Sequence, residues 1–152
     1  MDKPRFVYVT YIVTTPEAVW TALTDAETSR RFWGRENISD WMVGSPWQHR
    51  LPGAAPDVVG KVLESDPPRH LVTSWASPAD PDNPDKTSRC AYEIEDLGGK
   101  VRLTVTHTDL DAQGLRDVAR GWPAVLSNLK TLLETGRTLP DPFGALRGPP
   151  QR

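Results

Sequence analysis

Three polar side chains occupy alternating positions that could bring them together in an interior hollow. His107 follows three apolar residues at every second position of one predicted strand, so we expect it to share their inward face. Glu64 shares a strand face with Val62, and Tyr92 alternates with Ile94. An imidazole, a carboxyl and a phenol at one cavity could orient a ligand or act on it as acid and base. The structural alternatives are a hydrogen-bonded core histidine and a strand-end glutamate in water.

Six tryptophans are a large number for a chain of 152 residues. Trp75 shares one face of a predicted strand with Leu71, and Trp122 lies on the apolar face of a long helical pattern. Either ring could seal a core or form the wall of a ligand cavity. Cys90 alternates with Tyr92 on an apolar face, so we expect it to be an inert small hydrophobe.

Composition and charge exclude several classes of protein. Eighteen Lys and Arg against twenty Asp and Glu give a net charge of −2 and a pI near 5.9, which argues against a nucleic-acid binder. The single Cys90 excludes an intramolecular disulfide and a thiolate zinc site, and the three histidines lack metal-ligand spacing. We therefore expect no metal and no cofactor. The sequence shows no signal peptide and no membrane span, so we expect a cytoplasmic protein.

Strand and helix patterns follow one another in a clear order. The predicted elements are a strand at 5–13, helices at 16–23 and 26–33, strands at 37–42, 46–51, 57–65, 70–77, 87–96 and 100–108, and a helix at 115–134. Thr15 and Asp25 are the expected N-cap residues of the two short helices. Pro123 lies inside the long helical pattern, which predicts a kink or a fresh start near Gly121.

This order predicts an α+β fold in a single domain, residues 1–136. Short links make the sheet antiparallel with about seven strands, and the long helix must cover its apolar face. A twisted sheet of that size curves, and one helix cannot fill the hollow, so a cavity between sheet and helix is expected. Residues 137–152 contain four prolines and little periodicity, and we predict a mobile C-terminal tail there.

Six segments carry a resemblance to a known family. They are Thr14–Asp25, Asp40–Gly44, Gly60–Glu64, Asp66–Val72 with Trp75, Leu103–His107, and Gly121–Trp122 with Leu126 and Leu129–Lys130. As an ordered set covering residues 5–135, they resemble the AHSA-type proteins. These are homologues of the activator of the heat-shock-protein-90 ATPase, within the START/SRPBCC superfamily.

The resemblance implies a helix-grip fold, similar to the birch-pollen-allergen fold, in which a curved antiparallel sheet wraps round the C-terminal helix. In that fold the second helix and the first hairpin lie close to the cavity mouth, which adds side chains from both to the candidates. The predicted ligand-binding residues are Trp33, Trp47, His49, Glu64, Trp75, Tyr92, His107 and Trp122. No residue is assigned a catalytic role.

Three functions stay open from the sequence. Families on this scaffold bind lipids, sterols or polyketides, so the first hypothesis is binding of a small hydrophobic or amphipathic molecule, lipid- or polyketide-like, in the cavity. The second is an enzyme of the polyketide cyclase or aromatase type that uses the same cavity. The third is a co-chaperone or protein-interaction module. The eukaryotic activators carry a further domain that does not fit in 152 residues, so we expect no chaperone partner, while a homodimer stays open.

Overall fold

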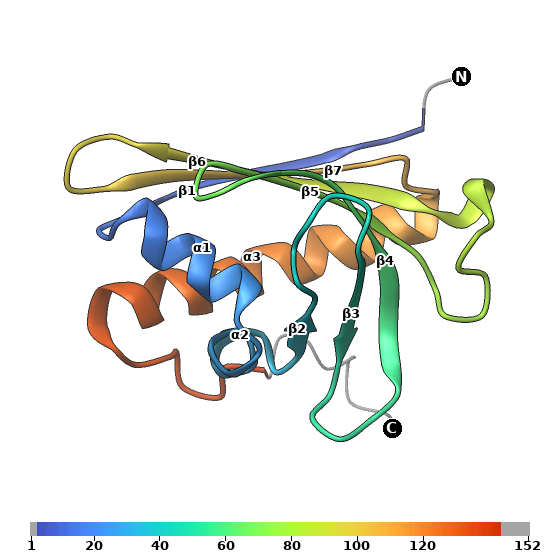
Figure 1. Cartoon of the computed structure of the whole chain (residues 1–152). Helices are drawn as coiled ribbons and strands as arrows, with labels where there is room; N and C mark the ends of the chain where they lie inside the picture. The colour runs from blue at the N-terminus through green and yellow to red at the C-terminus, as the bar shows by residue number, and fades with distance from the viewer. Residues whose placement is uncertain (1–2, 144–152) are drawn as a thin grey trace.

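The computed structural model describes residues 3–143, which form one antiparallel sheet with three α-helices beneath its inner face (Figure 1). The elements in chain order are β1 (Phe6–Ile12), α1 (Pro16–Thr24), α2 (Ala26–Trp33), β2 (Glu36–Ile38), β3 (Pro46–Arg50), β4 (Pro56–Asp66), β5 (His70–Trp75), the 3-10 helix η1 (Pro84–Lys86), β6 (Ser88–Asp96), β7 (Val101–Thr108) and α3 (Ala112–Thr135).

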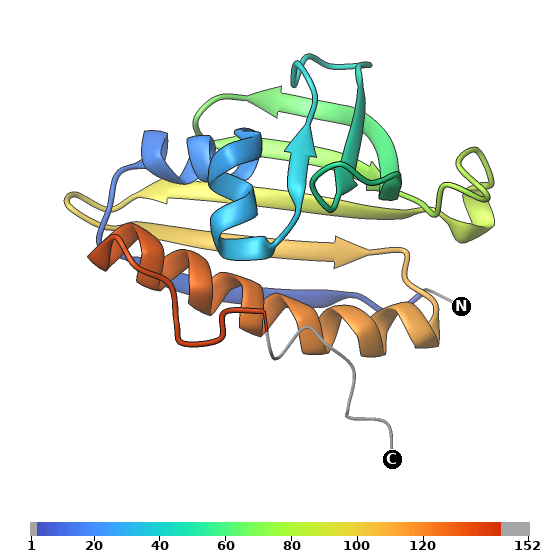
Figure 2. The ribbon, with the colours of Figure 1, turned by 90° about the horizontal axis from the view of Figure 1, so that it is seen from below.

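The sheet has seven strands in the order β1-β7-β6-β5-β4-β3-β2. It curves downward at the β2–β4 end, and α3 runs below the β1 end (Figures 1 and 2). The curved sheet, the two short helices after β1 and the long C-terminal helix confirm the predicted α+β, helix-grip architecture.

Local sequence signals start and stop the short helices. The hydroxyl of Thr15 accepts a hydrogen bond from Ala18 N, and Pro16 occupies the first turn of α1. The carboxylate of Asp25 caps α2 in the same way, by accepting from Thr28 N. Gly34 ends α2 at φ 75°, a left-handed conformation that favours glycine.

The long helix differs from its prediction in two respects. It begins at Ala112 because Asp111 caps it, with Gly114 N donating to Asp111 Oδ1 at 2.7 Å. It then runs through Pro123 without a fresh start, so that part of the prediction is wrong. One lost backbone hydrogen bond is outweighed by burial of the apolar face around Trp122. Neither α3 nor any other helix within residues 3–143 is both long and apolar enough to cross a membrane.

The core lies between the inner face of the sheet and the helices. Side chains along β7 alternate strictly between buried and half-buried positions, as the sequence predicted, and His107 takes the fourth buried place. The buried apolar side chains come from every α-helix and most strands, and include Ile12, Val19, Phe32, Leu71, Leu103, Val105, Leu126 and Leu129.

Gly60 lies where a side chain from β3 and the backbone of β5 come very close to β4. It pairs with Trp47 across β3 and β4, and the indole Nε1–H of Trp47 reaches over it to donate to Ser74 O at 2.7 Å. A Cβ at position 60 would lie 2.1 Å from Ser74 O and 2.6 Å from Trp47 Nε1. Only glycine fits there.

β1 is an edge strand, and its outer face is apolar. Val7, Val9 and Tyr11 alternate with inward residues and are each about half exposed. Two side chains of α3 bind backbone groups near the end of this strand. Lys130 Nζ donates to Tyr11 O, and Val13 N donates to Glu134 Oε2.

The first residues of the predicted tail contact the domain. Asn128 on α3 donates to Pro142 O, and the ring of Phe143 lies against Gly34. Residues 144–152 of the predicted mobile tail lie outside the described part of the chain.

Candidate functional site

Six rings meet where α2 and α3 face the sheet, and we call them the aromatic cluster. Its members are Trp33, Trp47, His49, Trp75, His107 and Trp122. Trp75 is central, with ring centroids 5.2 Å from His107, 5.4 Å from Trp47 and 6.1 Å from Trp122. Because these rings pack on one another, they occupy most of the deep hollow that the sequence predicted between sheet and helix.

His107 is held between a donor and an acceptor. The indole of Trp122 donates to its Nδ1 at 3.2 Å, so Nδ1 carries the lone pair and the neutral ring carries its proton on Nε2. That Nε2 lies 2.7 Å from the hydroxyl of Ser88, which in turn donates to Trp75 O at 3.3 Å. Burial lowers the pKa of His107 from 6.5 to about 4, which keeps the ring neutral at pH 7.

The hydrogen bonds of His49 favour the tautomer opposite to that of His107. Asn37 donates its amide to Leu23 O at 2.9 Å, which turns its Oδ1 toward His49 as an acceptor. His49 Nδ1 lies 2.6 Å from that oxygen and must therefore carry the proton. Burial, and then the positive charge of Arg35, lower the pKa of His49 from 6.5 to about 3.

Long-range proton–nitrogen NMR is expected to find the two buried histidines in opposite neutral tautomers, Nε2–H at His107 and Nδ1–H at His49. Replacing Trp122→Phe keeps an aromatic ring but removes the indole donor, so both tautomers of His107 should become populated. The tautomer of His49 should not change in this variant, because its partner Asn37 is untouched. A single Nδ1–H form at His107 in the parent protein would contradict the geometry.

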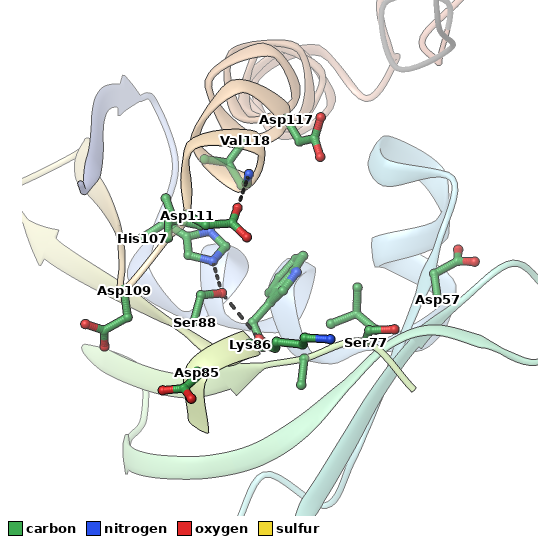
Figure 3. A pocket seen from close by; sticks show the side chains of 15 residues that line it. Asp57, Ser77, Asp85, Lys86, Ser88, His107, Asp109, Asp111, Asp117 and Val118 are labelled. Carbon is green, nitrogen blue, oxygen red and sulfur yellow. Dashed lines mark hydrogen bonds between the residues drawn. The ribbon is translucent and has the colours of Figure 1, made fainter. Parts of the chain in front are cut away.

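An open pocket of about 390 Å³ lies beside the aromatic cluster, at the N-terminal end of α3 (Figure 3). Trp75 and His107 are the two cluster members that line it. Val58, Ala76, Leu110 and Val118 add apolar walls. The pocket thus opens between the first turns of α3 and the part of the sheet formed by β4 and β5.

The other predicted site residues are not brought to this pocket. Trp122 and Tyr92 are buried behind it, with Tyr92 against Trp122 at 6.0 Å between ring centroids. Trp33 and Trp47 line two other open pockets, of about 370 and 500 Å³, and His49 lies inside the aromatic cluster.

Glu64 lies on the outer face of the sheet, which corrects the expectation that it shares the inward face of Val62. The pairing of β4 with β5 shifts between Val62 and Glu64, and such a bulge reverses the side on which the following residue lies. Its half-exposed carboxylate instead binds Arg89 at 2.6 Å and His70 at 3.1 Å.

Burial also sets the chemistry of the neighbouring thiol and phenol. It raises the pKa of Cys90 to about 12 and the pKa of Tyr92 well above its usual 10, so both groups stay protonated. No group of three His, Cys, Asp or Glu side chains in residues 3–143 is arranged to hold a metal ion.

Several pocket residues were missed from the sequence. Ser88 had a usable signal, because it continues the inward alternation of Cys90 and Tyr92. The others lie at the start of β4, in η1 or in connections between elements, where no period in the sequence marks an inward face. They are Asp57, Ser77, Asp85, Lys86, Asp109 and Asp111.

Comparison with known proteins identifies the family of the chain. The family model described as "Activator of Hsp90 ATPase homolog 1-like protein" matches residues 13–134. A comparison with curated proteins found no match.

Solved structures with the same fold are distant in sequence. The crystal structure of CalU16 from Micromonospora echinospora is 24% identical with a TM-score of 0.69, over 87% of this chain and 77% of that one. PFC0360w, titled an HSP90 activator from Plasmodium falciparum, is 24% identical with a TM-score of 0.72, over 85% and 95%. The Aha1 dimer from Colwellia psychrerythraea is 19% identical with a TM-score of 0.72, over 88% and 98%. These likenesses support the fold, and the family model covers most of the chain. The chain therefore belongs to the Activator of Hsp90 ATPase homolog 1-like family.

Proposed function

We propose that this protein binds a small apolar or amphipathic molecule in the pocket beside Trp75 and His107. The observation that carries the proposal is an open pocket of about 390 Å³ that an indole and a buried, neutral imidazole help to line. Ligand sites in proteins span roughly 300–1,000 Å³ and combine apolar walls with a few fixed polar groups. This pocket has both, so a molecule the size of one or two fused rings is the expected occupant.

The polar groups of the pocket suit recognition better than proton transfer. Both nitrogens of His107 are occupied by partners in the fold, and its Nε2–H faces Ser88, so the ring cannot take a proton from that hydroxyl. Glu64 and Tyr92, the other two groups a cyclase-type reaction was predicted to use, do not line the pocket. The geometry thus gives no support to acid–base chemistry by this set of residues.

Binding can be tested with 1-naphthalenemethanol, a neutral two-ring probe. We expect saturable shifts of the Trp75 indole signal and of the backbone amide signals of Ser88 and Val118, which also line the pocket, in proton–nitrogen NMR spectra, and the amide signals report binding in every variant. The variant Trp75→Ala should weaken binding at least about tenfold, because the aromatic contact area is lost. Trp20→Ala is the matched control, since Trp20 is also half-buried but lies on α1, away from the pocket.

The control should keep the parent affinity while losing a similar contact with the core. Equal weakening in the two variants, with both still folded by circular dichroism, would mean that the probe responds to overall stability. Absence of any saturable shift in the parent protein would remove the pocket as a binding site for two-ring apolar molecules.

A further inference from the structure

The rim of the pocket is strongly acidic compared with the rest of the chain. The charged residues that line it are five aspartates and one lysine, namely Asp57, Asp85, Asp109, Asp111, Asp117 and Lys86. Their formal charge is −4, whereas the whole chain carries −2. The residues that do not line the pocket therefore sum to a charge of +2.

The aspartates surround the pocket instead of forming its floor (Figure 3). They come from four separate places in the chain: the start of β4, η1, the β7–α3 connection and the first turns of α3. The apolar walls and Trp75 lie between them. A bound molecule would thus meet aromatic surface inside and carboxylates around the mouth.

Protein cations neutralise these carboxylates only in part. Arg35 pairs with Asp57 at 2.5 Å, and Lys3 donates to the backbone oxygen of Asp85 at 3.2 Å. Lys86, the one basic residue of the lining, is itself drawn toward Asp80 at 3.4 Å. None of these three contacts reaches the side-chain carboxylate of Asp85 or Asp109.

Two of the rim carboxylates have no hydrogen bond or ion pair with the described residues. Asp85 and Asp109 are exposed, and only the backbone of Asp85 is engaged. By contrast, Asp111 caps α3, and Asp117 accepts from Gln113 at 2.9 Å. Asp85 and Asp109 are therefore the side chains through which a cationic ligand would be recognised.

The interior of the pocket is compatible with a cation at the rim. The imidazole of His107 is neutral at pH 7 and adds no repulsion. Trp75 offers an indole, the aromatic ring that attracts cations most strongly. A charged amine would gain from both the carboxylates and the ring, whereas an anion would be opposed by the same field.

We infer that this pocket selects amphipathic amines, molecules that join an apolar ring to a positively charged ammonium group. The ring would lie against Trp75 and the ammonium group among the rim aspartates. This inference rests on the proposed binding function and adds the charge of the ligand to it.

Three probes that share one ring system but differ in charge separate the contribution of the charge to affinity from that of the ring. They are 1-naphthylmethylamine, which is cationic at pH 7, neutral 1-naphthalenemethanol, and anionic 1-naphthylacetate. Calorimetric titration at low salt is expected to rank them in that order, with the amine bound about tenfold more tightly than the alcohol. Added salt should reduce the difference in affinity between the amine and the alcohol. The carboxylates lie at a mouth open to solvent, where charges are screened within about 10 Å at 0.1 M salt.

A double variant, Asp85→Asn with Asp109→Asn, tests the rim itself. It should lower the affinity for the amine several-fold and leave the alcohol unchanged. Asparagine keeps the shape of both side chains and tolerates the positive φ of 61° at position 109. The charge-matched control, Glu17→Gln with Glu27→Gln, removes two negative charges on α1 and α2, away from this pocket, and should change neither affinity.

The outcomes separate the two proposals. Equal affinities for the amine and the alcohol, or tighter binding of the anion, would overturn the amine inference while leaving the binding function in place. An equal loss of affinity for the amine in the aspartate double variant and in the glutamate control would overturn the amine inference as well. No binding of any of the three probes would overturn both.

Discussion

Replacing Gly60→Ala is expected to cost about 3 kcal/mol of the free energy of unfolding, at the upper end of the range for overpacking. The added methyl would lie 2.1 Å from Ser74 O, which is backbone and cannot rotate away. Relief requires β4 to move from β5 or the Trp47 indole to leave its hydrogen bond with Ser74 O. Urea unfolding followed by tryptophan fluorescence measures the loss, and the corresponding fall in Tm is roughly 10 °C.

Gly121→Ala is the matched control for this variant. A Cβ at position 121 meets nothing within 4 Å, and the residue lies in the middle of α3. The same chemical change should therefore stabilise the protein by about 0.5–1 kcal/mol, through the higher helix propensity of alanine. Similar behaviour of the two variants would show that position 60 has more room than the structure allows.

Lowering the pH from 7 to 5 is expected to remove about 4 kcal/mol of stability, through His49 and His107 together. The folded state holds the pKa of these groups at about 3 and about 4, against 6.5 for a free side chain. At pH 5 both imidazoles are therefore almost fully protonated in the unfolded chain, whereas both stay largely neutral in the folded protein. Because the unfolded state binds more protons, stability falls as the pH falls.

The slope of the unfolding free energy against pH shows whether the two buried histidines cause the loss of stability. Near pH 5 it should approach 2.7 kcal/mol per pH unit, about 1.36 for each histidine. The variant His49→Gln should roughly halve the slope, whatever it does to the stability itself. The carboxyls of Glu95 and Glu134, whose pKa values are lowered by Arg102 and Lys130, lose their contribution only as the pH falls below about 4.5. A flat profile between pH 7 and 5 would show that both imidazoles are protonated in the folded state.

Much of the fold was predictable because its signals are local and repeated. Thr15 and Asp25 cap the helices that they were expected to cap. The strict alternation along β7 placed His107 on the inner face together with its apolar neighbours. The strand predicted at 37–42 is shorter in the structure and ends at Ile38, and beyond it Trp41 has a φ of 61°. No period in the sequence marks that turn.

The site was less predictable because it depends on the register of the strand pairing and on how large side chains fill the interior. A one-residue shift beside Glu64 moves its carboxylate to the outer face, and nothing in the sequence of β4 signals the bulge. The size of the hollow depended on how four indoles and two imidazoles pack together. Their types were visible in the sequence, but their mutual contacts were not. The acidic rim is assembled from four separate parts of the chain that only folding brings together.

The edge strand β1 has a consequence for the behaviour of the chain at high concentration. Its outer face exposes Val7, Val9 and Tyr11, and a hydrophobic edge of this kind is a template on which another chain can add a strand. Lys130 and Glu134 already occupy the backbone groups at Tyr11 and Val13, so the template is interrupted at that end. Another chain that added a strand at this end of β1 would first have to displace these two side chains and the ion pair that joins them.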